Sequence, residues 1–158
     1  MSKRLTVEKV SDFELALRAG ESSGLCLRRQ VVLREGQPVW EIVHEGPHLF
    51  SGTWTIVDYV TRQPLAASSY LATSFRYGED LTIRQFDSGQ EWLFRRVDPD
   101  QDRWLLLTLA SEVVLESAPP RPEAPGAWEL RATGGVDPAD LLPVVCLLAF
   151  DRLTSGRL

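Results

Sequence analysis

One segment near the carboxyl end restricts the possible folds more than any other: LLPVVCLLAF, Leu141 to Phe150, which has no polar face. Asp140 can cap a helix here, and Pro143 fits the first turn because its missing N–H would have had no intrahelical partner there. We therefore predict a helix over residues 141–153, roughly 20 Å long. A helix that is apolar on every side must be surrounded by protein, and this one is shorter than the roughly 18 residues of a membrane span.

The chain before this segment has the pattern of β-strands. From Leu25 to Arg34 apolar and polar residues alternate, as expected for one strand with one covered face, and only Arg29 interrupts the apolar set. The covered face of this strand comprises Leu25, Leu27, Val31 and Leu33. A turn at residues 35–37 leads to further predicted strands at 39–44, 54–59, 65–75, 81–86, 91–97, 104–115 and 127–132. Neighbouring strands joined by turns indicate an antiparallel meander.

The aromatic residues and the prolines support this division. All five tryptophans lie on or beside the predicted strands, where such side chains usually belong to the core. Residues 117–126, SAPPRPEAPG, contain four prolines and therefore form a surface loop.

These elements predict a single domain over residues 1–158, of the mainly β (α+β) class, because a chain of this length can bury a self-sufficient core. Residues 1–24 form a lead-in that can include a first strand. An apolar helix in a chain of strands is expected inside a closed or nearly closed barrel of those strands. Closure also removes the exposed sheet edges that a meander otherwise leaves.

Three segments resemble the tubby-like C-terminal superfamily, which includes the LURP-one-related proteins and the phospholipid scramblases. LLPVVCLLAFDRL, Leu141 to Leu153, is similar to the terminal helix of that family. REGQPVWEI at Arg34 to Ile42 and DYVTRQPLAAS at Asp58 to Ser68 resemble its recurring unit of an acidic turn and a return strand, although the usual turn glycine is absent at residues 60–63. The resemblance extends over most of the chain from Leu25 onward. It implies an antiparallel barrel of about twelve strands around one central helix, in a family with no established catalytic core.

The resemblance also indicates which functions to consider. Members of the family include phosphoinositide binders and proteins argued to act on membranes. The chain has neither the acidic calcium-binding segment of scramblases beside the helix nor a lysine cluster, so this lipid activity is not carried over. We expect a non-enzymatic binding or scaffold module that contacts phospholipid head groups or a protein partner. The alternative is a lipocalin-like carrier that holds a small apolar ligand inside the barrel.

The stretch HEGPH, His44 to His48, matches the H-E-x-x-H pattern of zinc peptidases. That chemistry needs a helix, which brings both histidines to one face. Gly46 is a poor helix former, and Pro47 pushes the residue before it out of the helical region. We therefore expect the end of a strand here and no metal site. A metal-dependent hydrolase that uses His44 and His48 remains the third functional hypothesis.

No other catalytic pattern is present. The chain has no G-x-S-x-G elbow, P-loop or G-x-G-x-x-G, so we assign no catalytic residue and no cofactor. Its two cysteines do not indicate a disulfide framework, and Cys146 on the apolar segment should behave as a small hydrophobe. The first residues lack the apolar run of a signal peptide, which predicts a cytoplasmic protein.

The charge of the chain argues against non-specific binding to nucleic acid or to an anionic membrane, because 22 acidic residues oppose 17 basic ones. Any such contact requires a local patch of basic residues. If strands 81–86 and 91–97 pair across a turn at 87–90, Arg84 and Arg95 lie on one face as diagonal neighbours. With Arg76 nearby they form a candidate site for a phosphate, a phospholipid head group or a carboxylate. The alternative interpretation is a solvated barrel exterior.

Overall fold

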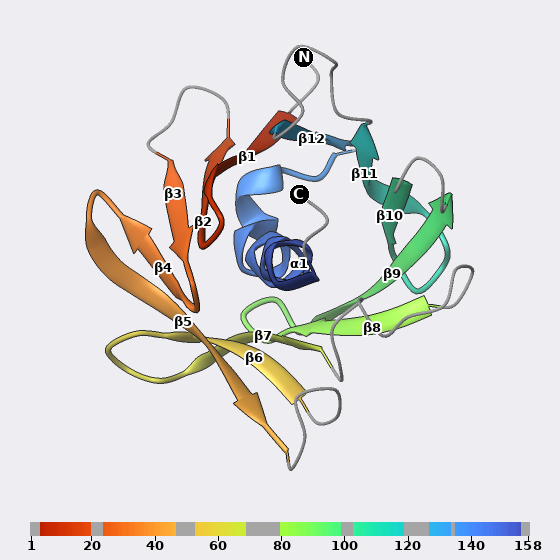
Figure 1. Cartoon of the computed structure of the whole chain (residues 1–158). Coiled ribbons are helices and arrows are strands. Elements are labelled where there is room, and N and C mark those ends of the chain that lie inside the picture. The colour runs from red at the N-terminus through yellow and green to blue at the C-terminus, as the bar shows by residue number, and fades with distance from the viewer. Residues whose placement is uncertain are drawn as a thin grey trace.

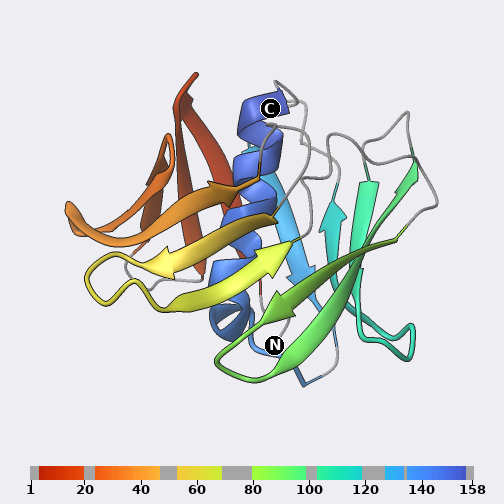
Figure 2. The same cartoon turned by 90° about the horizontal axis from the view of Figure 1, so that it is seen from below.

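A computed structural model describes residues 4–19, 24–46, 53–68, 80–98, 103–118, 127–133 and 135–155. Figure 1 and Figure 2 show strands arranged around a central helix. The strands are β1 (Arg4–Ser11), β2 (Glu14–Ala19), β3 (Leu25–Arg28), β4 (Val31–Arg34), β5 (Gln37–Glu45), β6 (Thr53–Asp58), β7 (Pro64–Ser68), β8 (Asp80–Gln85), β9 (Gln90–Asp98), β10 (Arg103–Leu107), β11 (Val113–Ala118) and β12 (Ala127–Ala132).

The twelve strands form one closed antiparallel barrel in which each strand pairs with the next along the chain. The barrel closes between its first and last strands, where Leu5 of β1 lies opposite Leu130 of β12. The predicted fold class is therefore confirmed, as is the strand number of about twelve. Closure gives every strand two neighbours and so leaves no open sheet edge.

The helix occupies the inside of this barrel. A 3-10 turn, η2 (Pro138–Leu141), leads into α1 (Leu142–Ser155), and Figure 1 looks nearly along the barrel with α1 at its centre. Every residue from Val144 to Phe150 is buried, and α1 contacts β2, β6, β7 and β8. The prediction that sheet surrounds the apolar segment is confirmed. No helix in the described part of the chain has the length and apolar character needed to cross a membrane.

Inward-facing side chains of the strands complete the core. In β8, Leu81 and Ile83 point to the lumen while Thr82 is exposed. Trp54, Trp92 and Trp104 are buried, as predicted for strand-borne tryptophans, and Trp54 lies 5.2 Å from the ring of Phe150 on α1. Helix and wall therefore share a single hydrophobic core.

The single strand predicted from Leu25 to Arg34 is wrong, because this segment is a hairpin of β3 and β4. Arg29 begins its two-residue turn with a φ of 57°, and its N–H donates to the carbonyl oxygen of Phe13 at 2.8 Å. A two-residue turn shifts the alternation by one position. Val32 consequently faces the core, whereas the predicted inward residues Val31 and Leu33 are only half-buried.

The strand predicted over residues 104–115 is also two strands, β10 and β11. The N–H of Thr108 donates to the carbonyl oxygen of Glu112 at 2.8 Å, and Ser111 adopts a φ of 66° between them. This turn follows an almost unbroken apolar run, so periodicity alone does not mark it.

The amino-terminal lead-in contributes two strands where at most one was predicted. Both are structural parts of the barrel, because β1 pairs with β12 and β2 pairs with β3. The polar residues between the apolar positions of β1 and β2 lie on the outer face, as the exposure of Thr6, Glu8 and Arg18 shows.

The residue that caps the start of the helical segment is not the predicted one. Asp140 was predicted as the cap, but Asp137 occupies that position at the start of η2, where its carboxylate accepts a hydrogen bond from the N–H of Ala139 at 3.0 Å. Pro143 lies in the first turn of α1, as predicted. The cap is displaced because one extra 3-10 turn precedes the α-helix.

A carboxylate stabilises the β6–β7 turn, which lacks glycine. Asp58 accepts hydrogen bonds from the N–H groups of Thr61 at 2.9 Å and Val60 at 3.0 Å, and Arg62 adopts a φ of 64°. The backbone donors of Thr61 and then Val60 hold the pKa of Asp58 below its ordinary value. The turn is thus closed by an ionised side chain in place of a glycine.

Some predicted segments lie partly outside the described residues. These are the end of the strand predicted at 65–75 and most of the loop at 117–126.

Burial of α1 makes Leu148, 4% exposed, a sensitive position. Leu148→Asp places an unpaired charge in the core and should prevent folding, because such a charge costs more than the stability of a typical domain can absorb. Far-UV and near-UV circular dichroism will measure this. Val10→Asp is the matched control at a position that is 59% exposed, and it should change stability by less than about 0.5 kcal/mol. A folded Leu148→Asp protein would contradict the burial of this face.

Candidate functional site

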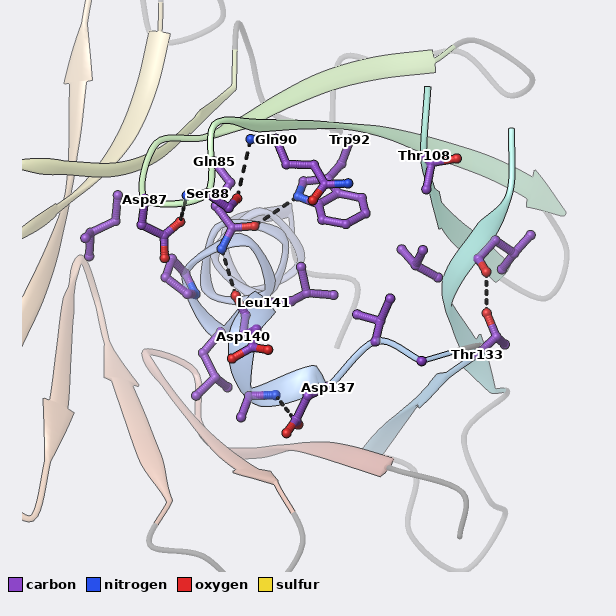
Figure 3. A pocket seen from close by; sticks show the side chains of 18 of the residues that line it. Gln85, Asp87, Ser88, Gln90, Trp92, Thr108, Thr133, Asp137, Asp140 and Leu141 are labelled. Carbon is purple, nitrogen blue, oxygen red and sulfur yellow. Dashed lines mark hydrogen bonds between the residues drawn. The ribbon is translucent and has the colours of Figure 1, made fainter. Parts of the chain in front are cut away.

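A cavity of about 720 Å³ lies at the barrel end where the helical segment begins, which we call the mouth. Figure 3 shows this mouth cavity between the β8–β9 turn, the β10–β11 turn and the residues that lead into α1. Its volume falls within the range of roughly 300–1,000 Å³ that is typical of small-molecule sites. The mouth cavity is therefore large enough to hold a ligand or several side chains of a partner.

The position of the cavity follows from the connectivity. In an antiparallel meander, alternate turns lie at the same end, so the turns that follow β4, β6, β8 and β10 surround the mouth together with the connection that follows β12. Figure 2 shows α1 beginning among these turns and ending at the opposite end of the barrel. The chain thus passes from the wall into the lumen at the mouth, where Pro138 and Leu141 are its buried anchors.

Gln85 connects the wall to the helical segment at the base of the cavity. Although it is polar, its side chain takes an inward position of β8 and is 3% exposed. Its Nε2 donates to the backbone oxygen of Asp140 at 2.7 Å, and its Oε1 accepts from Nε1 of Trp92 at 3.0 Å, as Figure 3 shows. Both ends of the amide are satisfied, so Gln85 holds η2 against the barrel wall.

The mouth cavity is acidic. Its lining contains four carboxylates, Asp87, Glu112, Asp137 and Asp140, and one guanidinium, Arg34. Asp137 is used as the cap of η2, and Asp87 accepts a hydrogen bond from the N–H of Ser88 at 2.8 Å. With the residues that the structure describes, the carboxylates of Asp87, Glu112 and Asp140 form no ion pair.

The lining also contains an aromatic ring, several neutral polar groups and aliphatic side chains such as those of Leu65, Val136 and Leu142. Trp40 is half-buried, and the guanidinium carbon of Arg34 lies 6.0 Å from its ring centroid. Ser88, Gln90 and Thr108 add hydroxyl and amide groups that can accept hydrogen bonds. The cavity therefore offers many acceptors and one permanent cation.

The predicted arginine patch does not form as proposed. Arg84 lies opposite Glu91, and Arg95 lies opposite Asp80, so the two arginines share a face but are four residues apart along the ladder. They are not diagonal neighbours, because the turn spans residues 86–89 and the register differs by two from the predicted one. Arg76 lies outside the described residues.

Arg84 instead borders a small groove on the outer wall. This groove of about 280 Å³ lies where the small side chains of Ala67 and Thr82 leave a depression between β6 and β9. Arg84 donates to a carboxylate oxygen of Glu91 from its terminal nitrogen at 3.2 Å. Its charge is therefore already balanced by a neighbour, which reduces its value for binding a phosphate.

The HEGPH motif begins in a strand. His44 and Glu45 are the last two residues of β5, and the His44 ring lies 4.6 Å from the ring of Trp54. Gly46 then adopts a φ of 143°, a conformation that a helix does not contain, and His48 lies outside the described residues. Within the described parts of the chain, no group of three His, Cys, Asp or Glu side chains is arranged to hold a metal ion.

Neither cysteine has the properties of a nucleophile. Burial raises the pKa of Cys146 to about 12. Partial burial raises the pKa of Cys26 to about 11, with further contributions from the hydrogen bond that its thiol donates to Glu14 at 2.8 Å and from the charge of that carboxylate. Both thiols are protonated at neutral pH and are correspondingly unreactive.

Comparisons with known proteins give little further information. No family model and no curated protein matches this sequence. Among solved structures, the X-ray structure of a protein from Arabidopsis thaliana is similar over 94% of this chain and 90% of that chain, with 9% sequence identity and a TM-score of 0.41. A similarity of this size assigns neither a family nor a function.

Sequence reasoning did not find the mouth cavity, because its lining residues come from turns that are distant in the sequence. Gln85 had a recognisable signal: it continues the inward positions of Leu81 and Ile83 but is polar. A polar residue at a core position of a strand indicates a specific buried partner.

Replacement of Gln85 tests its role at the base of the cavity. Gln85→Leu leaves Nε1 of Trp92 and the carbonyl oxygen of Asp140 without this partner, and it should lower the free energy of unfolding by about 1 to 3 kcal/mol. Urea titration followed by tryptophan fluorescence measures the change. Gln90→Leu, the same replacement at an exposed position of the same hairpin, is the control and should change stability by less than about 0.5 kcal/mol. Equal losses in both variants would show that Gln85 has no special role.

The contact between Cys26 and Glu14 makes a prediction about thiol reactivity. Because the negative charge of Glu14 favours the protonated thiol, Glu14→Gln should lower the pKa of Cys26 and increase its alkylation rate at pH 8. In both proteins the rate should rise with pH up to about the thiol pKa. Mass spectrometry after iodoacetamide treatment measures each cysteine separately, and Cys146 serves as the internal control. An unchanged Cys26 rate would exclude Glu14 as a cause of the raised pKa.

Proposed function

We propose that this protein is a non-enzymatic binding module that engages its ligand or partner at the mouth of the barrel. The observation that carries the proposal is that the barrel is filled at its centre and hollow at its mouth. Buried helix fills the lumen, whereas the mouth retains a cavity of about 720 Å³ with polar and aromatic side chains. Binding sites in barrels commonly lie at such mouths.

Occupancy of the lumen favours this function over that of an apolar-ligand carrier. A lipocalin-like carrier keeps a hollow interior, but here Val144, Leu148 and Phe150 pack against the inward side chains of the wall. An apolar ligand could enter only by displacing α1 and exposing its apolar surface. That displacement would cost far more than a small ligand returns.

The proposed kinship is with the tubby-like and LURP-one-related proteins. It is supported by the three sequence segments that resemble the family and by the closed barrel around a terminal helix, which that resemblance implies. The lipid-binding properties of the family receive less support. Arg84 is paired with Glu91, and the mouth is acidic, so both surfaces are unfavourable for an anionic head group.

Fragment screening by ¹⁵N-NMR tests the mouth as the binding site. We expect weakly binding fragments to shift the indole signal of Trp92 and the amide signals of Asp87 and Ser88, because hot spots for fragments coincide with functional cavities. Native mass spectrometry should show the 17.7 kDa chain without a retained ligand.

The same experiments define what would contradict the proposal. Fragments that shift only lumen-facing signals, or a co-purified apolar ligand, would establish the carrier instead. Flotation with vesicles that contain anionic lipid, but not with neutral vesicles, would establish head-group binding. Stoichiometric zinc in protein purified without a histidine tag would support the hydrolase with His44 as a ligand.

A further inference from the structure

We propose that the mouth cavity receives a lysine or arginine side chain from a basic segment of a partner protein. This inference rests on the proposed function and adds the chemistry of the partner.

The charge of the cavity selects a cation over an anion. Asp87, Glu112 and Asp140 form no ion pair with the described residues, and Arg34 is the only base among the described residues of the lining. These three acidic residues are exposed and border one concave surface, so the fields of their carboxylates add there and attract cations. An anion would find one guanidinium there and would be repelled by four carboxylates.

The neutral polar groups of the lining also favour a cation over an anion. An ammonium or guanidinium group brings several N–H donors and no acceptor, so it needs oxygen atoms around it. The side chains of Ser88, Gln90 and Thr108 can accept such hydrogen bonds at the cavity wall. Trp40 adds an aromatic ring to the lining, and the guanidinium carbon of Arg34 lies 6.0 Å from its centroid.

Apolar side chains beside the cavity favour a protein as the source of the cation. Leu109 is 59% exposed on the β10–β11 turn, between the lining residues Thr108 and Glu112. The half-buried side chains of Val136 and Leu142 belong to the lining itself. A peptide can cover these apolar groups while its basic side chain enters the cavity, whereas a free amine leaves them in water.

The test uses a lysine-rich peptide with leucines, together with versions of it in which glutamine or glutamate replaces every lysine, and spermidine as a free amine. Fluorescence anisotropy measures peptide binding to the full chain, and unlabelled spermidine competes. The mouth variant carries Asp87→Asn, Glu112→Gln and Asp140→Asn. Asp137 is left unchanged because it caps η2. The control variant carries Glu8→Gln, Asp12→Asn and Glu45→Gln. These replacements change the net charge by the same amount as the mouth variant does, but at exposed positions toward the barrel end opposite the mouth.

The expected result is binding of the lysine peptide alone. The mouth variant should bind it about tenfold more weakly, the factor expected for the loss of three exposed ion pairs, and the control variant should bind it as the wild type does. Salt at about 0.5 M should weaken the wild-type complex. Circular dichroism confirms that each variant is folded.

Four results would overturn the inference. Equal weakening in both variants would show a general charge effect, and spermidine competing as strongly as the lysine peptide itself would make a free amine the ligand. Absence of lysine-peptide binding would exclude the basic segment. If the glutamine or glutamate peptide bound and shifted the NMR signals of Trp92, Asp87 and Ser88, the mouth would not select a cation. The proposed function as a binding module at the mouth would still hold.

Discussion

The structure depends on one mutual requirement. The apolar helix must be surrounded by sheet on every side, and the barrel must have its interior filled. An eight-stranded barrel can fill its interior with side chains alone, but diameter grows with strand number, so twelve strands enclose a space that side chains cannot fill. A helix about 10 Å across fits that space. The helix must then be apolar on all sides, which explains why Val144 to Phe150 include no polar residue.

The same requirement creates a polar problem where the chain enters the lumen. The first N–H groups of a helical segment lack intrahelical partners, and its backbone passes close to the apolar core. Asp137 satisfies one donor from the outside, and Gln85 binds the carbonyl oxygen of Asp140 from the wall. The side chains that make these hydrogen bonds are polar, and they cannot interdigitate as leucine side chains do. Polar groups therefore lie among the aliphatic side chains that line the cavity at this end of the barrel.

Much of the fold could be predicted because its signals are local. Apolar continuity identified the helix, and alternation placed Leu25 and Leu27 of β3 on the buried face. The errors arose where a turn interrupts the chain without a change in polarity. In the β3–β4 hairpin only Arg29 marked the turn, and a two-residue turn reverses which positions face inward. In the β8–β9 hairpin, a register difference of two residues separated Arg84 from Arg95.

The mouth cavity could not be predicted in this way, because its residues become neighbours only when the barrel closes. Asp87 and Glu112 belong to different hairpins, and each alone is an ordinary turn acid. Their joint effect depends on the rigidity of those turns, which internal hydrogen bonds at Thr108 and Ser88 provide. A preformed arrangement of charges loses little entropy on binding. The mouth cavity is thus a property of the closed barrel, whereas the position of each acidic side chain in its lining is set by a local turn.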